Sequence, residues 1–259
     1  MDCYGKMIER DGKIRKRIFA HYKRAIEHYG EENVLGVFLY GSQNYDCDLE
    51  TSDVDTKCIL LPDLYHLALH PYKTTHLSVP RENGEDEVCE CMTIQHMVAN
   101  WKKQNPNFLE IMFTPHCYVN AMYRDAWNAF ITMWREEVAR YDVRAGVLSI
   151  AHQAIHTIKQ NPMDGKKLGN GIRLWELLSK YVAGEDYVKC LKCDVAETVR
   201  RYKTCETTPC LTLGNFLIDA LNAMINNAED LPGPRRELDV PLDNFVMMLL
   251  NARIQADEY

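Results

Sequence analysis

The sequence predicts an α+β fold, in which a small lobe that contains the strands is followed by a mostly helical lobe. Short apolar or alternating segments bounded by turn residues, which is the pattern of strands, fall within the first 95 residues. From about residue 94 onward, apolar residues recur mostly at helical spacing instead. Because this segregation along the chain favours an α+β architecture, we assign residues 1–118 to the first lobe and 119–259 to the second.

The first lobe is expected to begin with an amphipathic helix and two buried strands. Residues 11–29 place apolar side chains at helical spacing, and Gly30 follows as a helix C-cap. The apolar run VLGVFLY at 34–40 predicts a strand, and VDTKCILL at 54–61 predicts a second strand that Pro62 ends. Between the two strands the chain enters a Gly-Ser turn.

A short helix and a third strand are expected next. Residues 63–70 favour the helix, and residues 74–83 favour a strand or an exposed loop. The segment EVCECM at 87–92 alternates as a strand does, and Thr93 then opens a helix. The alternation predicts that Val88, Glu90 and Met92 share one face of the strand, and that Cys89 and Cys91 share the other.

The second half of the chain is expected to consist of helices. Apolar residues at helical spacing predict them at 107–113, 120–140, 144–160, 170–183, 194–203, 212–228 and 241–255. The tryptophans at 101, 127, 134 and 175 lie on such segments and are expected in the core.

Composition and charge limit the classes of function that the protein can have. The 259 residues are 46% hydrophobic and 26% charged, with a formal net charge of −7 and a pI near 5.7. This acidic balance argues against a broad, sequence-blind nucleic-acid binder, which usually has a basic surface. The charged N-terminal segment does not resemble a signal peptide, and no apolar stretch is long enough to span a bilayer. We therefore expect a cytoplasmic protein without a membrane partner, whose ten cysteines are reduced.

Four cysteines in the second half allow two interpretations. Cys190 and Cys193 are separated by two residues, and Cys205 and Cys210 by four, so a structural zinc site is conceivable. The second spacing is loose, however, and cysteine is also common as a small buried hydrophobic residue. We favour packing and keep zinc as an alternative.

The most specific chemical pattern is GSQNYDCDLETSDVD at 41–55, directly after the strand at 34–40. Asp53 and Asp55 are spaced i, i+2 at the start of a strand, so both carboxylates point the same way. Carboxylate oxygens are the ligands that Mg²⁺ prefers, and paired Mg²⁺ ions support nucleotidyl transfer. Gly41 lets the backbone approach phosphate oxygens, and Ser42 adds a hydroxyl and a backbone N–H. The pattern therefore predicts a metal-dependent nucleotidyl-transfer site.

Further charged residues are candidates for the same site. Glu90 is the third carboxylate, because a charge inside an apolar alternating strand is costly without a cation, although a solvated strand face remains the alternative. Lys57 shares the parity of the two aspartates, so it faces the nucleotide or extends to solvent as a strand lysine. Lys166, Lys167 and Arg173 are candidates for binding the triphosphate, or they form a solvated basic helix start. Glu110, in an apolar helix, is expected in a structural ion pair.

The segment LYGSQNYDCDLETSDVDTK resembles the signature of the DNA polymerase β superfamily of nucleotidyltransferases. It is most similar to a bacterial and phage branch associated with RNA repair. The segments KKQNPNFLEIMFT at 102–114 and GKKLGNGIRLWELL at 165–178 extend the resemblance. It implies a polymerase β-like lobe with a five-stranded mixed sheet, or a trimmed version, and a helical C-terminal region. It also implies that Gly41 and Ser42 bind the triphosphate of an NTP and that Asp53, Asp55 and Glu90 bind Mg²⁺ or Mn²⁺.

The chain departs from this branch at three positions. The branch often has a glycine where Asp46 stands, so the turn after Ser42 is open to a different conformation. It often has a histidine where Asn170 stands, and that histidine's role does not carry over. Its third carboxylate is commonly Asp rather than Glu90.

The leading hypothesis is a nucleotidyltransferase that transfers a nucleoside monophosphate from an NTP to an RNA end, a protein side chain or a small molecule. The fold alone does not select the acceptor. The alternative from another class is a catalytically silent nucleotide-binding regulator with the same fold. A third reading is a zinc-stabilised interaction module built on the cysteines of residues 190–210.

Overall fold

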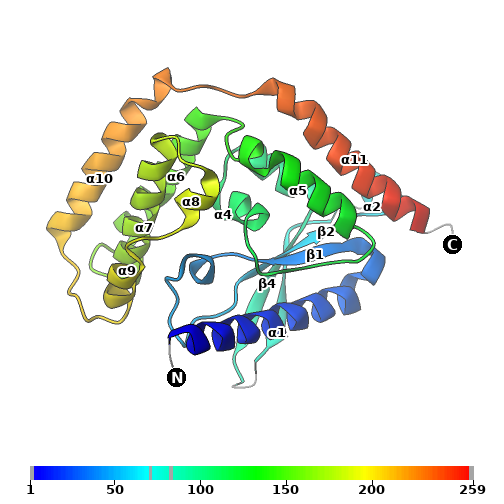
Figure 1. The fold of residues 1–259 in the computed structure, drawn as a ribbon, viewed down its shortest axis with the longest axis horizontal. Helices are drawn as coiled ribbons and strands as arrows, with labels where there is room; N and C mark the ends of the chain where they lie inside the picture. The colour runs from blue at the N-terminus through cyan, green and yellow to red at the C-terminus, as the bar shows by residue number, and fades with distance from the viewer. Residues whose placement is uncertain (1–2, 70–71, 82–83, 257–259) are drawn as a thin grey trace.

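Five strands form one mixed sheet in the order β3-β4-β2-β1-β5 in the computed structural model (Figure 1). The structure describes residues 3–69, 72–81 and 84–256. The strands are β1 (Val34–Leu39), β2 (Thr56–Leu60), β3 (Thr75–Pro80), β4 (Asp86–Thr93) and β5 (Cys117–Val119). β2 and β4 run parallel, whereas the other neighbouring pairs are antiparallel. The expected α+β class is confirmed.

Helix α1 (Cys3–Tyr29) packs along one face of the sheet. Its side chains Ile14, Ile18 and Tyr22 are buried in an apolar cluster with inward-facing residues of the strands. These positions recur every three or four residues, so they form one stripe of an amphipathic helix. Figure 1 shows α1 running the length of this face.

The opposite face of the sheet carries a second and larger apolar core. It is covered by α3 (Ile94–Lys102), α5 (Arg124–Val138) and α11 (Asp239–Ala256), the last two lying across the sheet from α1 (Figure 1). The rings of Phe130 and Phe245 stack here at 3.9 Å between centroids. This core is continuous from the sheet into the helical half, and the predicted division at residues 118/119 falls within β5. That division stays a prediction.

The short helix expected at 63–70 is α2 (Leu64–Ala68), and residue 70 lies outside the described residues. The other helices form a bundle beside the sheet. They are α4 (Pro106–Leu109), α6 (Val143–Gln160), α7 (Gly165–Val182), α8 (Tyr187–Leu191), α9 (Ala196–Lys203) and α10 (Leu211–Asn226). Asp164 caps α7 by accepting the N–H of Lys166 at 2.8 Å. A Cβ at Gly165 would lie 2.0 Å from the Tyr202 carbonyl oxygen, so only glycine allows α9 to pack this closely. The first turn of α7 is thereby fixed in position.

Most of the predicted elements are confirmed, but three differ. The segment at 74–83 forms strand β3 as far as Pro80, and residues 82–83 lie outside the described residues. The segment at 107–113 is the short helix α4 followed by a 3₁₀ turn at Glu110–Met112. The helix expected at 120–140 begins only at Arg124, because residues 120–123 form a turn in which Asn120 Oδ1 accepts the Met122 N–H at 3.0 Å.

The expected distribution of side chains is also confirmed. Cys89 and Cys91 of β4 belong to the core under α1, whereas Met92 belongs to the opposite core. Trp101 and Trp127 are buried, and the other two tryptophans pack against the same core while partly buried.

Helix α11 returns to the start of the sheet. The Nε of Arg253 donates a hydrogen bond of 2.6 Å to Asn33 Oδ1, although 220 residues separate the two. Both side chains are buried. Within the described ranges, none of the helices combines the length and the apolar character that crossing a bilayer requires.

Candidate functional site

The turn that follows β1 is built on Gly41. Its φ of 90° and ψ of −157° lie in a region that residues with a side chain rarely adopt. A Cβ at this position would lie 3.4 Å from Asp55 Oδ2, so the Asp55 carboxylate lies directly against the turn. Ser42 then begins the 3₁₀ turn Ser42–Tyr45, and the Asn44 side chain donates to the Leu39 carbonyl at 3.0 Å. The predicted Gly-Ser turn therefore meets one of the predicted aspartates.

Glu110 lies behind this turn. Its Oε1 accepts the Gly41 N–H at 3.2 Å, while its Oε2 is buried and has no hydrogen-bond partner within the described chain. Burial raises the pKa of Glu110 to about 8, although Arg173 and the Gly41 N–H act in the opposite direction. The expected structural ion pair is not formed within the described residues. Glu110 instead anchors the backbone of the turn.

The charges of Asp53 and Lys166 both act on Asp55. Asp55 is partly buried, and burial together with the negative charge of Asp53 raises its pKa. Lys166, at the start of α7, and Lys57, on β2, oppose this rise. Lys166 thus brings a positive charge from the helical half of the chain within electrostatic range of Asp55, as a cation that binds phosphate would.

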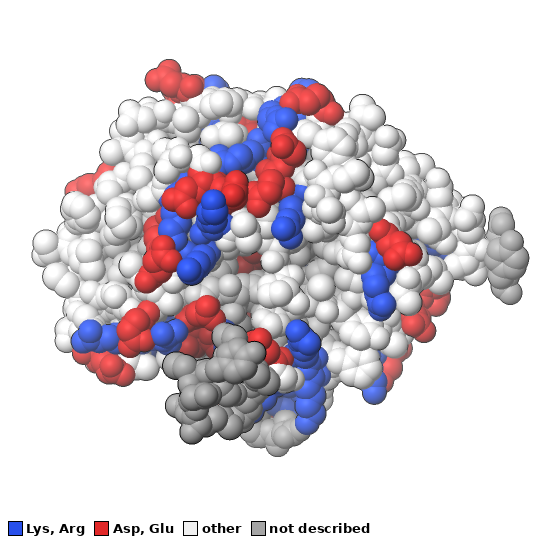
Figure 2. Space-filling model, in the orientation of Figure 1, with Lys and Arg blue, Asp and Glu red and all other residues white. Residues whose placement is uncertain are grey.

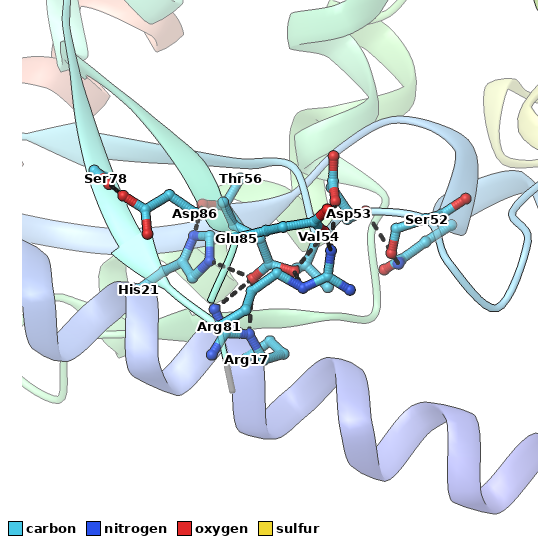
Figure 3. Close-up of polar contacts among 12 residues, drawn as sticks. Arg17, His21, Ser52, Asp53, Val54, Thr56, Ser78, Arg81, Glu85 and Asp86 are labelled. Carbon is cyan, nitrogen blue, oxygen red and sulfur yellow. Dashed lines mark hydrogen bonds and ion pairs between the residues drawn. The ribbon is translucent and has the colours of Figure 1, made fainter. Parts of the chain in front are cut away.

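Asp53 is also held by a cation. Its Oδ1 lies 2.7 Å from Arg81 Nη1, at the end of β3, and its side chain remains 60% exposed (Figure 3). Arg81 Nε lies 3.5 Å from Glu87 Oε1. Asp53 is therefore tied to a charge cluster on the α1 side of the sheet.

Glu87 is the centre of that cluster. It accepts the Val54 N–H at 3.0 Å, contacts His21 Nε2 at 3.0 Å and pairs with Arg17 at 2.6 Å. Burial alone raises the pKa of Glu87, but the bonds from His21, Val54 and Arg17 outweigh it and lower the pKa to about 2. Figure 3 shows Arg17 and His21 rising from α1 toward Val54 and Arg81. Because it holds the Val54 N–H, Glu87 fixes the backbone between the two aspartates.

Lys57 and Glu90 form an ion pair on the opposite face of the sheet. They are directly opposite each other in the parallel register of β2 and β4. The Lys57 Nζ also lies over the rings of Tyr40, at 4.0 Å from the centroid, and Phe108, at 4.5 Å. Burial lowers the pKa of Lys57, and Glu90 opposes that change. Lys57 thus neutralises the proposed third carboxylate in this arrangement.

The predicted metal ligands fit a hard cation in part. Within the described residues, no group of three or more His, Cys, Asp or Glu side chains is arranged to hold a metal ion. Neither the three predicted carboxylates nor the cysteines of residues 190–210 form such a group. Asp53 and Asp55 nevertheless repel each other, as the raised pKa of Asp55 indicates, and a cation between them would relieve the repulsion. Glu90 is engaged by Lys57. Asp55 therefore fits Mg²⁺, whereas Asp53 and Glu90 fit it only when their ion pairs with Arg81 and Lys57 open.

The two remaining predicted phosphate ligands are placed differently from Lys166. Lys167 Nζ donates to Gln160 Oε1 at 2.6 Å at the end of α6, and the structure does not bring it to the aspartates. Arg173 is buried, lies 4.1 Å over the Tyr45 ring and donates from Nε to Asn170 Oδ1 at 3.2 Å. Arg173 therefore packs against the Ser42–Tyr45 turn through the Tyr45 ring.

Cations that the sequence did not indicate hold the loop after the turn. Asp46 adopts a left-handed conformation with φ of 57°, which glycine prefers and aspartate tolerates. Arg10 pairs with Asp46 at 2.7 Å, and from the helical half Arg200 donates to the Asp46 carbonyl and Lys203 to the Cys47 carbonyl. These partners lie far from the loop in sequence, so no local pattern could have found them.

The charges elsewhere on the protein are mixed. The face shown in Figure 2 carries interspersed basic and acidic side chains. A comparison of the chain with protein-family models finds no match, and a comparison with curated proteins finds none. The assignment of a function therefore rests on the site itself.

Proposed function

We propose that the protein is a nucleotidyltransferase that transfers a nucleoside monophosphate from an NTP to an acceptor. The observation that carries the proposal is the position of the Asp55 carboxylate against the Gly41 turn, within range of the positive charge of Lys166. The Asp55 carboxylate lies against the glycine turn, and Lys166 is close enough to affect the pKa of Asp55. A turn without a side chain, a carboxylate pair and a lysine are what a bound triphosphate and its cation require.

Each residue of the site has its own role in the proposed reaction. Asp53 and Asp55 would hold Mg²⁺ or Mn²⁺, which when bound neutralises the triphosphate and activates the acceptor oxygen. Lys166 supplies a positive charge to the phosphate oxygens, and Ser42 a hydroxyl. Gly41 leaves room for the phosphates, while its own N–H is engaged by Glu110. Glu90 is proposed as a further metal ligand, and Lys57 holds it when the cation is absent.

A second candidate is a nucleotide-binding regulator of the same fold without turnover. Two ion pairs favour it, because Arg81 neutralises Asp53 and Lys57 neutralises Glu90. A site whose carboxylates stay paired would bind a nucleotide without assembling the metal centre. The polymerase β resemblance supports both candidates, since each keeps the same fold.

The test incubates the full chain with Mg²⁺ or Mn²⁺ and each labelled NTP, with and without total RNA or cell lysate. Pyrophosphate release and a labelled product are expected from the wild type. The double variant Asp53→Ala/Asp55→Ala should lose both, and Asp219→Ala, an exposed aspartate on α10, should keep both. The label on RNA, protein or a small molecule then identifies the acceptor class.

Calorimetric titration with each NTP separates the two candidates. NTP binding without any labelled product or pyrophosphate would establish the silent regulator. If neither wild type nor double variant binds any NTP and no product forms, both candidates are wrong.

A further inference from the structure

The Arg81 guanidinium occupies one of the two aspartates that the proposed function gives to the cation. Its Nη1 donates to Asp53 Oδ1 at 2.7 Å, and the Asp53 side chain remains 60% exposed (Figure 3). Asp53 stands two positions before Asp55, whose carboxylate lies against the Gly41 turn. A cation that uses both aspartates therefore meets the guanidinium of Arg81 where it has to bind.

Arg81 has carboxylate partners besides Asp53. Its Nε lies 3.5 Å from Glu87 Oε1, and its Nη1 lies 3.4 Å from Glu85 Oε2. The backbone is also fixed, because the Arg81 N–H donates to the Glu85 carbonyl at 2.8 Å. If a ligand took Asp53 away, Arg81 would therefore still lie next to two carboxylates.

Part of the guanidinium is open to a further ligand. The Nη2 of Arg81 has no hydrogen-bond partner among the described residues, and the side chain is 18% exposed. A guanidinium carries five N–H donors in a planar fork, which matches two oxygens of a phosphate group. Arg81 thus has donors left for a phosphate, next to the aspartate that is predicted to bind the cation.

The second ion pair of the site is less suited to exchange its partner. Lys57 is buried, and its ammonium contacts Glu90 and lies over two aromatic rings. Without Glu90 this ammonium would be buried without the carboxylate that it contacts, which is costly. The pair of Arg81 with Asp53 is instead partly exposed, and such pairs contribute little stability. It is therefore the pair that a cation opens first.

We propose that Arg81 is a phosphate-binding residue that Asp53 holds until a divalent cation and an NTP bind together. Asp53 exchanges the guanidinium for the cation, because a doubly charged ion attracts a carboxylate more strongly. Arg81 then donates from Nη1 and Nη2 to oxygens of the triphosphate. No covalent bond forms or breaks in this exchange. The role of Arg81 rests on the proposed function, which brings the triphosphate to the Gly41 turn.

The exchange couples the affinities of the cation and the nucleotide. Without an NTP, Arg81 competes with the cation for Asp53, so that the cation alone binds weakly. With an NTP, Arg81 gains phosphate oxygens in place of Asp53, so each ligand raises the affinity for the other. Loss of Arg81 should therefore change the two affinities in opposite directions, which loss of a purely structural arginine would not do.

The first test measures the binding of Mn²⁺ alone to the full chain, from the loss of the electron paramagnetic resonance signal of free Mn²⁺. Arg81→Met should bind Mn²⁺ about two- to fivefold more tightly than wild type, because a partly exposed ion pair no longer competes. Arg235→Met is the matched control, since it removes an arginine from its exposed pair with Glu137, and it should bind Mn²⁺ as wild type does. Equal or weaker Mn²⁺ binding by Arg81→Met would overturn the competition.

The second test titrates each NTP in the presence of Mg²⁺ by calorimetry. Arg81→Met should bind the preferred NTP about tenfold more weakly than wild type, because charge-assisted hydrogen bonds are lost. Arg81→Lys keeps a charge for Asp53 but not the planar fork, so it should bind Mn²⁺ as wild type does and the NTP more weakly. This second variant decides the phosphate role even if Arg81→Met does not fold.

Failure of this role and failure of the proposed function give different results. If wild type binds an NTP and the Arg81 variants bind it equally well, the role of Arg81 is wrong and the proposed function stands. If none of the proteins binds any NTP, the proposed function is wrong and the role of Arg81 fails with it.

Discussion

Glu110 accepts the Gly41 N–H at 3.2 Å, so the turn after β1 is held by a buried carboxylate that lies 69 residues away in sequence. The second oxygen of this carboxylate is buried without a hydrogen-bond partner in the described chain. A single side chain therefore links the conformation of the proposed phosphate-binding turn to a group whose pKa is raised to about 8.

Replacing Glu110 with glutamine should change how stability depends on pH. Since the folded pKa of about 8 exceeds the ordinary 4.5, wild type binds an extra proton between these values and loses stability as pH rises from about 5 to 8. Each pKa unit corresponds to about 1.4 kcal/mol, so the shift sets an upper bound of about 5 kcal/mol on this loss. Glu110→Gln should flatten the slope in urea unfolding between pH 5 and 8. An unchanged slope would mean that Glu110 does not titrate in this range.

Glu87 should produce the opposite pH dependence. Its folded pKa of about 2 lies below the ordinary 4.5, so its contribution is complete above pH 4.5 and is lost as the pH falls toward 2. Glu87→Gln should destabilise the protein at pH 7 by about 2–4 kcal/mol, because Arg17 and His21 lose their buried carboxylate. Urea unfolding at pH 7 and pH 3 measures both effects. The idea fails if the variant and wild type differ as much at pH 3 as at pH 7.

Gly41→Ala should disturb the site beyond its effect on stability. Forcing alanine to the φ of 90° should cost about 1–3 kcal/mol. Gly184→Ala is the matched control, because Gly184 has a φ of 83° and open space around it. Both variants should lose stability, but only Gly41→Ala should weaken ATP binding in calorimetry. Equal ATP affinities for the two variants would contradict a role of the turn in binding.

Lys57 and Glu90 should behave as a coupled pair. Glu90→Gln leaves the buried Lys57 ammonium without its carboxylate and should cost about 2–4 kcal/mol. Lys57→Met should cost less, because Glu90 is partly exposed. The double variant should lose about 1–3 kcal/mol less stability than the sum of the losses of the two single variants. Urea unfolding of all four proteins measures the coupling, and additivity within about 0.5 kcal/mol would exclude it.

Lys166 and Lys167 offer a comparison between neighbours. The charge of Lys166 lowers the pKa of Asp55, whereas Lys167 binds Gln160. Lys166→Ala should lower the affinity for a non-hydrolysable ATP analogue by about tenfold, which corresponds to about 1.4 kcal/mol. Lys167→Ala should leave the affinity within about twofold, since that change removes an exposed contact alone. The reverse order of effects would assign the phosphate to Lys167.

The parts of the fold that the sequence predicts are those encoded locally. The strand at Val34–Leu39 and the glycine turn follow from adjacent residues. The strand β5 was missed because three residues are too short for a periodic pattern. Arg81 is 28 residues from Asp53, and Lys203 is 156 residues from Cys47, so these contacts depend on the tertiary fold. The ion pair between Lys57 and Glu90 could not be predicted from either residue alone, because it depends on the register between β2 and β4.

The hydrogen bond between Arg253 and Asn33 has a consequence for synthesis of the protein. The last helix supplies Phe245 to the core over the sheet and Arg253 to the segment before β1. A ribosome therefore releases the strands long before the chain can cover their second apolar face. Until α11 emerges, the part of that face that it covers stays exposed to chaperones and to aggregation, and the large core cannot be completed before then.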